Sequence, residues 1–506
     1  MTARLLSFPL LLVLAGISAV LMFLPALDAL IRDDHSMARA FAYSGLLGLF
    51  VVFVIGLAIS GEQRKKSGDL ANLLSLFLAY TLLPLFMAIP FYEGLATTRF
   101  LNAYVEMVSC FTTTGATLFD VPGRLVDSLH LWRALVGWGG GLLIWVSASA
   151  VLAPLALGGF EVTASAEPGQ GDTRLDRFER ADAAKRIEQA VRQLAPIYFG
   201  LTAAAWLLLV ISGERSFVAL VHAMSTLATS GISSIGGPGE GSAGIAGEGV
   251  IFLFMFFALS RLTFSSDTLT SARPGLHHDP EFRLGVVLVL GVPMLLFLRH
   301  WFGAFEVDQS EDLQQGLRGL WGSIFTVLSF LSTTGFESAD WDAAQDWSGL
   351  GTPGLILLGL ALVGGGVATT AGGVKLLRVY TLYLNGQREM ERLIHPSSMG
   401  RAGARSRRIR RQGAFIAWIF FMLFALSLAL VTVLLAALGQ EFEAALVLSI
   451  AALSTTGPLT SVAATEPVAL LEMGAVAKLI FSAAMVVGRL ETLAIIAVFN
   501  PALWRD

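Results

Sequence analysis

Long apolar runs separated by short polar loops recur along the whole chain, and ten of them are long enough to cross a lipid bilayer. A transmembrane helix takes about 20 predominantly apolar residues. A signal peptide would explain only one such run, at the N-terminus. The pattern therefore predicts an all-α integral membrane protein. The expected spans are about Leu5–Leu24, Ala38–Ser60, Leu70–Pro90, Leu131–Leu155, Leu194–Ile211, Gly249–Phe264, Leu284–Trp301, Gly354–Leu384, Ala414–Leu438 and Ala469–Phe499.

Four further apolar segments, each between two spans, are too short to cross and end in a hydroxyl-rich tripeptide closed by glycine. The tripeptides are Thr113-Thr114-Gly115, Thr229-Ser230-Gly231, Thr333-Thr334-Gly335 and Thr455-Thr456-Gly457. Their glycines are 116, 104 and 122 residues apart, which is the period of a whole structural unit. Small residues recur three, six and twelve positions before each glycine, as a helix packed closely among other helices requires. The sequence thus predicts four half-length pore helices, each ending in a turn.

This repeat divides the chain into five parts. Residues 1–60 form two extra N-terminal transmembrane helices, and four pore repeats follow at 61–160, 161–270, 271–390 and 391–506. The second repeat includes a preceding cytoplasmic loop, and the third includes an intramembrane loop. We expect the four helix–pore helix–loop–helix repeats to surround one pore.

The four tripeptides suggest a selectivity filter for a monovalent cation. Irregular backbone at membrane depth is tolerated where it is buried in protein or lines a watery path. Four such loops around one axis could point their carbonyl oxygens inward and replace the hydration shell of an ion. The tripeptides carry no charged side chain, which favours coordination by neutral oxygens. The alternative is that these are structural turns of an unrelated transporter, because a single tripeptide of this kind is usually a loop or a helix cap.

The charges of the loops predict the topology. Basic residues gather in 61–69, 161–192 and 386–412, whereas the intervening loops are acidic. The positive-inside rule places the basic loops, and both termini, in the cytoplasm. The arginine cluster Arg401–Arg411 would then bind anionic membrane lipid, or alternatively a regulatory subunit. These features describe a multi-pass protein of the cytoplasmic (inner) membrane.

A glycine-rich run interrupts the second span of the third repeat. It reads Gly364-Gly365-Gly366-Val367-Ala368-Thr369-Thr370-Ala371-Gly372-Gly373 and is followed by Lys375. Each glycine costs a helix roughly 1 kcal/mol relative to alanine, so the run predicts a break. Close helix packing through small residues is the alternative. Arg489 lies deep in the last span, where a charge is costly. It either faces the pore or extends to the cytoplasmic interface.

Other function classes have little support in the sequence. Cys110 is the single cysteine, so neither an internal disulfide nor a cysteine metal cluster is available. No nucleotide-binding glycine loop, nucleophile elbow or zinc motif is present, and we expect neither an enzyme, nor an organic cofactor, nor nucleic-acid binding. An ion-coupled secondary transporter of a small solute remains the alternative. It would favour inverted repeats, whereas the four repeats here run in the same direction.

The motifs resemble those of the TrkH/KtrB/HKT superfamily of potassium transporters. The resemblance rests on the four-unit layout, on Phe111–Thr117 and Leu331–Phe336 around two tripeptides, and on Val487-Gly488-Arg489-Leu490-Glu491. The bacterial TrkH branch is the most similar, because it also has two extra spans before the four units. One departure is Ala368, where the family usually has glycine, and it puts the mobility of the loop in doubt.

The resemblance implies functions for these residues. The twelve tripeptide residues would bind potassium, and glycine in all four filter positions is similar to the potassium-selective type. The run Gly364–Gly373, with Lys375, would close the pore beneath the filter, and Arg489 would face the pore there. The resemblance also implies a pseudo-fourfold arrangement of the four repeats around the pore, a homodimer, and a cytoplasmic, nucleotide-binding RCK-type regulatory subunit similar to TrkA. The expected function is potassium uptake.

Overall fold

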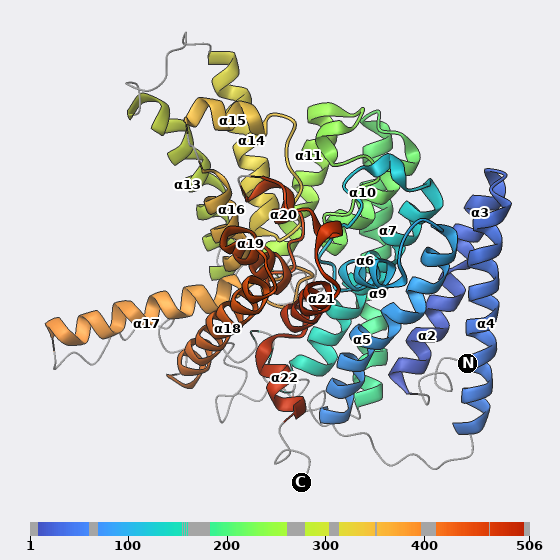
Figure 1. Ribbon diagram of the computed structural model, residues 1–506. Coiled ribbons are helices and arrows are strands. Elements are labelled where there is room, and N and C mark those ends of the chain that lie inside the picture. Colours follow the sequence, from blue (N-terminus) through green and yellow to red (C-terminus); the bar gives the residue numbers. More distant parts are fainter. Residues whose placement is uncertain are drawn as a thin grey trace.

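The computed structural model describes residues 9–59, 69–153, 155, 157, 159, 183–260, 279–302, 313–349, 352–395, 411–464 and 466–499. Within these residues every regular element is helical (Figure 1), as the apolar pattern predicts. Several segments on which sequence predictions fall lie outside the described residues. They are the basic loop before Asp69, residues 161–182, Arg401–Arg410 and both termini.

Three N-terminal helices precede the repeats and lie along one side of the molecule (Figure 1). Helices α2 (Leu10–Leu21) and α3 (Phe23–Ile31) meet at Met22 and together form one apolar segment, and α4 (His35–Ile59) returns antiparallel to them. They pack on α5 through Met22, Phe41 and small residues, whereas α4 exposes Phe50 and Phe53. An exposed apolar face of this kind suits lipid contact.

The first two repeats each contain a long helix, a pore helix and a second long segment. The first consists of α5 (Asp69–Gly94), α6 (Phe100–Phe111) and α7 (Asp127–Ser147), with η1 (Pro122–Arg124) before α7 and a π-helical turn η2 (Ala148–Leu152) after it. The second consists of α9 (Ala183–Ile211), α10 (Ser216–Ala228), η3 (Pro238–Glu240), α11 (Gly244–Met255) and η4 (Phe256–Leu259).

The third and fourth repeats follow the same plan with additional short helices. The third consists of α13 (Pro280–Phe302), α14 (Leu313–Leu331), α15 (Trp341–Ser348), α16 (Gly354–Val363) and α17 (Leu376–Ile394). The fourth consists of α18 (Arg411–Ala437), α19 (Phe442–Leu453), α20 (Leu459–Val462), η8 (Leu470–Glu472), α21 (Ala475–Leu490) and α22 (Thr492–Phe499).

The second segments of repeats 2, 3 and 4 are not continuous spanning helices, in contrast to the ten full spans expected. In the described part of the chain seven helices are long and apolar enough to cross a membrane. Helix α11 tightens into a 3₁₀ turn at Phe256, α16 stops at Gly364 (φ 71°), and α21 stops at Glu491 (φ 67°). The third pore helix, α14, is 19 residues long rather than half-length. The glycine run indicates the break after α16, but the turn at Glu491 has no comparable signal.

The repeats pack in cyclic order around the pore helices. Each pore helix contacts the second segment of the preceding repeat: α10 contacts α7, α14 contacts α11, α19 contacts α16, and α6 contacts α21. The last contact closes the ring between the fourth repeat and the first. Small residues make these contacts feasible, since Ala103, Ala219 and Ala445 are fully buried. The four pore helices α6, α10, α14 and α19 consequently lie on different sides of the middle of the molecule (Figure 1).

Candidate functional site: four filter loops and an intramembrane loop

The first threonine of each tripeptide has the left-handed backbone conformation. Its φ is 55° at Thr113, 49° at Thr229, 59° at Thr333 and 55° at Thr455. Such angles are uncommon for a β-branched residue, and strained residues of this kind cluster at functional sites. Their recurrence at one position of all four repeats indicates that the loops share one backbone design.

A hydrogen bond back to the pore helix stabilises each turn. The second residue of each tripeptide donates its N–H to the carbonyl oxygen five residues earlier, which caps the helix C-terminus. The bonds are Thr114 to Ser109 (2.8 Å), Ser230 to Ser225 (3.0 Å), Thr334 to Ser329 (2.9 Å) and Thr456 to Ala451 (2.8 Å). The accepting residues are the small ones that the sequence places six positions before each glycine.

The glycines bring the four loops into one closed ring. A Cβ added to Gly115 would lie 1.7 Å from the Ser230 carbonyl oxygen, and one on Gly231 would lie 2.4 Å from that of Thr334. One on Gly335 would lie 2.7 Å from Pro458 Cγ, and one on Gly457 would lie 2.0 Å from the Ala116 nitrogen. We number the loops 1 to 4 after the repeats that contain them. Each loop therefore contacts the next one and loop 4 contacts loop 1, with no room for a side chain at the contacts.

The fourth loop departs from the other three. Gly115, Gly231 and Gly335 have φ of 73°, 65° and 82°, whereas Gly457 does not have a positive φ. The N–H of Gly457 donates a 2.6 Å hydrogen bond to the Thr114 carbonyl oxygen. Pro458 follows Gly457 directly and restricts the conformation of the residue before it. The ring is thus pseudo-fourfold in layout but asymmetric in detail.

The hydroxyl groups of the tripeptides fall into two kinds. The second hydroxyl is held within its own loop, for example by the 2.8 Å contact between the Oγ1 atoms of Thr112 and Thr114. The first hydroxyls differ from loop to loop: that of Thr229 donates to the Ala228 carbonyl oxygen (2.8 Å), whereas the buried Oγ1 atoms of Thr113 and Thr455 have no hydrogen-bond partner. A buried polar oxygen without a partner is costly. These two oxygens therefore fit a cation that would bind at the ring.

The run Gly364–Gly373 is a non-helical loop between α16 and α17. Left-handed angles at Gly364 (71°), Ala368 (56°), Gly373 (76°) and Lys375 (86°) bend it back on itself. Ala368 adopts this conformation although it carries a Cβ, so the substitution strains the loop rather than preventing it. Gly365 and Gly366 pack against the backbone of η4, where the Gly366 N–H donates to the Ala258 carbonyl oxygen (2.9 Å).

This intramembrane loop lies against the helix ends of three repeats. The Thr370 hydroxyl donates to the Leu227 carbonyl oxygen (3.1 Å), and the Gly372 N–H donates to Thr333 Oγ1 (2.7 Å). A Cβ on Gly372 would lie 2.1 Å from the Ser454 carbonyl oxygen. Within the loop, the Thr369 hydroxyl donates to the Gly366 carbonyl oxygen, and Lys375 Nζ donates to that of Ala371. The loop therefore covers the ends of the filter turns.

Arg489 contacts this loop directly. Its side chain is buried, its Nη1 donates a 2.8 Å hydrogen bond to the Thr370 carbonyl oxygen, and its Nε and Nη2 atoms have no hydrogen-bond partner. The guanidinium thus lies inside the protein beside the loop and does not extend to an interface. Lys478, on the same helix, binds Asn102 Oδ1 and the Leu471 carbonyl oxygen instead, away from the loop.

Sequence reasoning missed the ion pair that holds this region together. Arg378 on α17 pairs with Glu491 at the end of α21 (Nη2 to Oε2, 2.7 Å), and the Arg378 guanidinium lies 3.6 Å from the centroid of the Phe420 ring. Glu491 therefore pairs with a residue of another repeat and not with Arg489. The signal that could have revealed Arg378 is its position in an apolar span, where a charge needs a partner.

Comparisons with known proteins agree over the length of the chain. Residues 245–505 match the family model of TrkH, described as a cation transport protein. The Trk system potassium uptake protein TrkH of Salmonella typhimurium is 30% identical over 494 residues, covering 96% of both chains. The protein of the same name in Escherichia coli K12 is 29% identical with the same coverage. The crystal structure of the potassium transporter TrkH from Vibrio parahaemolyticus superposes with a TM-score of 0.79 at 25% identity, covering all of both chains.

Proposed function

The chain belongs to the TrkH family of cation transport proteins, and we propose that it mediates potassium uptake across the cytoplasmic membrane through the ring of four filter loops. The observation that carries the proposal is the closed ring itself. Four glycine-closed turns from four repeats meet at one point, at the centre of a helical membrane protein. The relatives named as potassium uptake proteins support potassium as the transported ion.

In this proposal the filter consists of the twelve tripeptide residues, with potassium as the substrate. Backbone carbonyl oxygens of the turns would replace water around the ion. The unpartnered hydroxyls of Thr113 and Thr455 would add two neutral oxygens. The glycines are needed because any Cβ at the ring would collide with the neighbouring loop. The repeat boundaries at 61–160, 161–270, 271–390 and 391–506 are part of the same proposal.

The gate in this proposal is the intramembrane loop together with Arg489. The loop residues Gly364–Gly373 and Lys375 lie against the filter turns, and Arg489 binds the loop through Thr370. A guanidinium in the ion path would oppose a passing cation by roughly 4 kcal/mol at contact distance and an effective dielectric near 20. Movement of the loop, and of the arginine bound to it, would open the path.

Assembly and orientation complete the proposal. We expect a homodimer in which each chain has its own pore, with both termini in the cytoplasm and an RCK-type subunit similar to TrkA on that side. The family supports this arrangement, and several curated relatives are named as members of a Trk system. The mass of the purified protein in detergent, measured by light scattering, tests the dimer, and a monomer with full flux would contradict it.

Growth of cells that lack their own potassium uptake tests the function. Cells given this chain should grow on low potassium, and an empty vector should not support growth. A chain that reaches the membrane without restoring growth would contradict potassium uptake. Restored growth would also argue against the alternative, an ion-coupled transporter of an organic solute.

A further inference from the structure

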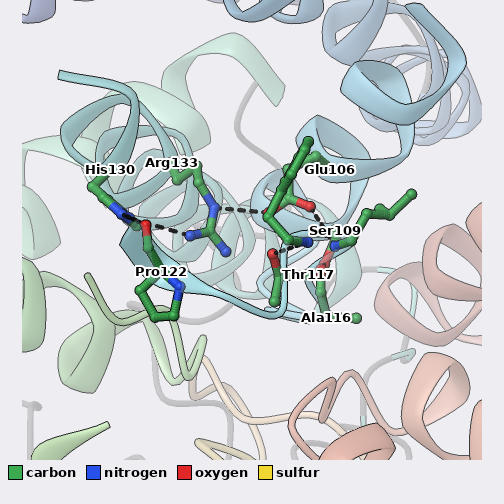
Figure 2. A network of polar contacts seen from close by, with 9 residues as sticks. Glu106, Ser109, Ala116, Thr117, Pro122, His130 and Arg133 are labelled. Carbon is green, nitrogen blue, oxygen red and sulfur yellow. Dashed lines mark hydrogen bonds and ion pairs between the residues drawn. The ribbon is translucent and has the colours of Figure 1, made fainter. Parts of the chain in front are cut away.

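A buried ion pair lies directly behind the first filter loop. Glu106 on the pore helix α6 is fully buried, and its Oε1 lies 2.7 Å from Nε of Arg133 on α7 (Figure 2). Its other oxygen, Oε2, accepts a 2.9 Å hydrogen bond from the N–H of Leu118. Leu118 is the third residue after Gly115. The carboxylate therefore holds the segment that follows the filter glycine, here called the exit segment of the loop, at a fixed distance from the pore helix.

Arg133 also contacts His130, on the side of its guanidinium group away from Glu106. Its Nη1 lies 3.4 Å from Nδ1 of His130, and Nε2 of His130 lies 3.0 Å from the carbonyl oxygen of Pro122 (Figure 2). Pro122 belongs to the same connection between the filter and α7. The network therefore fixes the exit segment of loop 1 at Leu118 and again at Pro122.

The equivalent position of the other repeats shows which loops have a comparable brace. Nine residues before the filter glycine stand Glu106, His222, Thr326 and Leu448. Nε2 of His222 lies 2.8 Å from Ser233 Oγ, and Thr326 Oγ1 accepts a weak 3.3 Å bond from the Ser338 N–H. The side chain of Leu448 has no polar atom. The residue nine positions before the filter glycine thus provides a charged acceptor in loop 1, a neutral polar group in loops 2 and 3, and no polar group in loop 4.

Loop 3 receives its charged acceptor from a neighbouring helix. Glu248 on α11 is buried and accepts hydrogen bonds from the Ala339 N–H (2.7 Å), Ser338 Oγ (2.8 Å) and Trp321 Nε1 (2.8 Å). Ser338 and Ala339 follow Gly335 by three and four residues, so this contact matches that of Glu106 with Leu118. Loops 1 and 3 lie opposite each other in the ring. In both, a buried carboxylate of a helix accepts a hydrogen bond from the exit segment of the loop.

We propose that Glu106 and Glu248 are positioning residues that hold filter loops 1 and 3 in register and thereby set the cation selectivity of the pore. Hydrogen bonds to a carboxylate are roughly twice as strong as neutral ones. Loops 1 and 3 are consequently the rigid pair, whereas loops 2 and 4 depend on weaker neutral contacts. This inference rests on the proposed filter function and names the groups that give the filter its dimensions.

Ion selectivity of reconstituted variants tests the proposal. Glu248→Gln weakens one brace, and the double variant Glu106→Gln with Arg133→Met weakens the other without leaving an unpaired buried arginine. Each should raise the sodium-to-potassium permeability ratio by roughly threefold to tenfold, the range that corresponds to the free energy of one hydrogen bond. Both should retain the thermal stability of a folded protein. Glu188→Gln, which removes a half-buried carboxylate paired with the exposed Arg192 on α9, is the matched control and should leave the ratio unchanged.

The outcomes separate positioning from a merely structural role. Folded variants with a wild-type permeability ratio would overturn the proposal, as would a lower flux for both ions at an unchanged ratio. Where a carboxylate variant fails to fold, Trp321→Phe removes one donor to Glu248 and should shift the ratio in the same direction. An unchanged ratio there would contradict the proposal. A wild-type protein without potassium-selective flux would instead contradict the proposed function.

Discussion

Nη1 of Arg489 donates a 2.8 Å hydrogen bond to the carbonyl oxygen of Thr370, which joins the last long helix of the fourth repeat to the intramembrane loop of the third. The two other guanidinium nitrogens are buried without a hydrogen-bond partner. An arrangement that leaves donors unsatisfied has a free-energy cost. In the proposed gate, this contact between Arg489 and the loop is the one that would change when the pore opens.

Replacing Arg489 by alanine should raise basal potassium flux. The substitution removes both the positive charge beside the proposed ion path and the hydrogen bond that holds Thr370. At roughly 4 kcal/mol of repulsion at contact distance, a substantial increase is expected, with selectivity retained because it resides in the filter. Arg489→Lys keeps the charge and should keep the flux low. Flux and thermal stability should be measured on the same samples, and lower flux in Arg489→Ala at equal abundance would argue for a structural role.

Gly372→Ala should also raise basal flux, by a steric route. Its Cβ would lie 2.1 Å from the Ser454 carbonyl oxygen and 2.3 Å from Thr455 Oγ1, so the loop has to move away from the filter. Gly359→Ala is the matched control on α16, because a Cβ there meets nothing within 4 Å. Equal tracer uptake by the two variants would contradict the assignment of the loop as a barrier.

Gly115→Ser should increase sodium permeability relative to potassium. The glycine has φ 73°, and a Cβ would lie 1.7 Å from the Ser230 carbonyl oxygen, so loops 1 and 2 have to separate. Gly123→Ser, in the same repeat, adds the same side chain where nothing lies within 4 Å. Bi-ionic reversal potentials measure the effect. Identical potentials for the two variants would show that Gly115 does not line the filter.

We expect Glu337 to make potassium entry and stability depend on pH. Burial, followed by the charge of Asp342, raises the pKa of this carboxyl from its usual 4.5 to about 7. A raised pKa means that the folded state binds the proton more tightly. The stability it contributes is fully present below pH 4.5 and is lost as pH rises through 7, a change on the order of 2 kcal/mol for this partly exposed group.

Two measurements check this dependence. Thermal stability should fall between about pH 4.5 and pH 7 in the wild type, the window between the unfolded and folded pKa values, and change less in Glu337→Gln. Potassium entry should rise as pH passes through 7, because the carboxylate of the folded protein ionises there, lies two residues beyond Gly335 and attracts cations. Asp342→Asn should move the midpoint to lower pH. A pH profile that Glu337→Gln leaves unchanged would exclude this group.

The sequence alone predicts the parts of the site that repeat or that have a local cost. Small residues six positions before each filter glycine predict closely packed pore helices, and the recurring tripeptides predict the turns that follow them. The capping bonds accepted by the carbonyls of these small residues become evident only in the structure. The glycine density of 364–373 predicts the break after α16. Pro458 also distinguishes the fourth turn, because proline restricts the residue before it, but its consequence for Gly457 becomes evident only in the structure.

The remainder depends on which helices become neighbours. Arg378 and Glu491 are 113 residues apart, and Glu248 and Ala339 are 91 apart, so local periodicity does not indicate either pair. The breaks at Phe256 and Glu491 likewise lie inside apolar runs. Apolar composition predicts a span in these places, but it does not predict whether the helix continues through it.

Ion flux through the purified protein in liposomes tests the central claim most directly. With an imposed membrane potential and a tenfold potassium gradient, the account predicts a potassium current that reverses near the potassium equilibrium potential, about 59 mV per tenfold gradient. Replacing potassium by sodium should shift the reversal potential strongly. A reversal potential that ignores the potassium gradient, or no flux from folded protein, would contradict a potassium-selective pore built from the four filter loops.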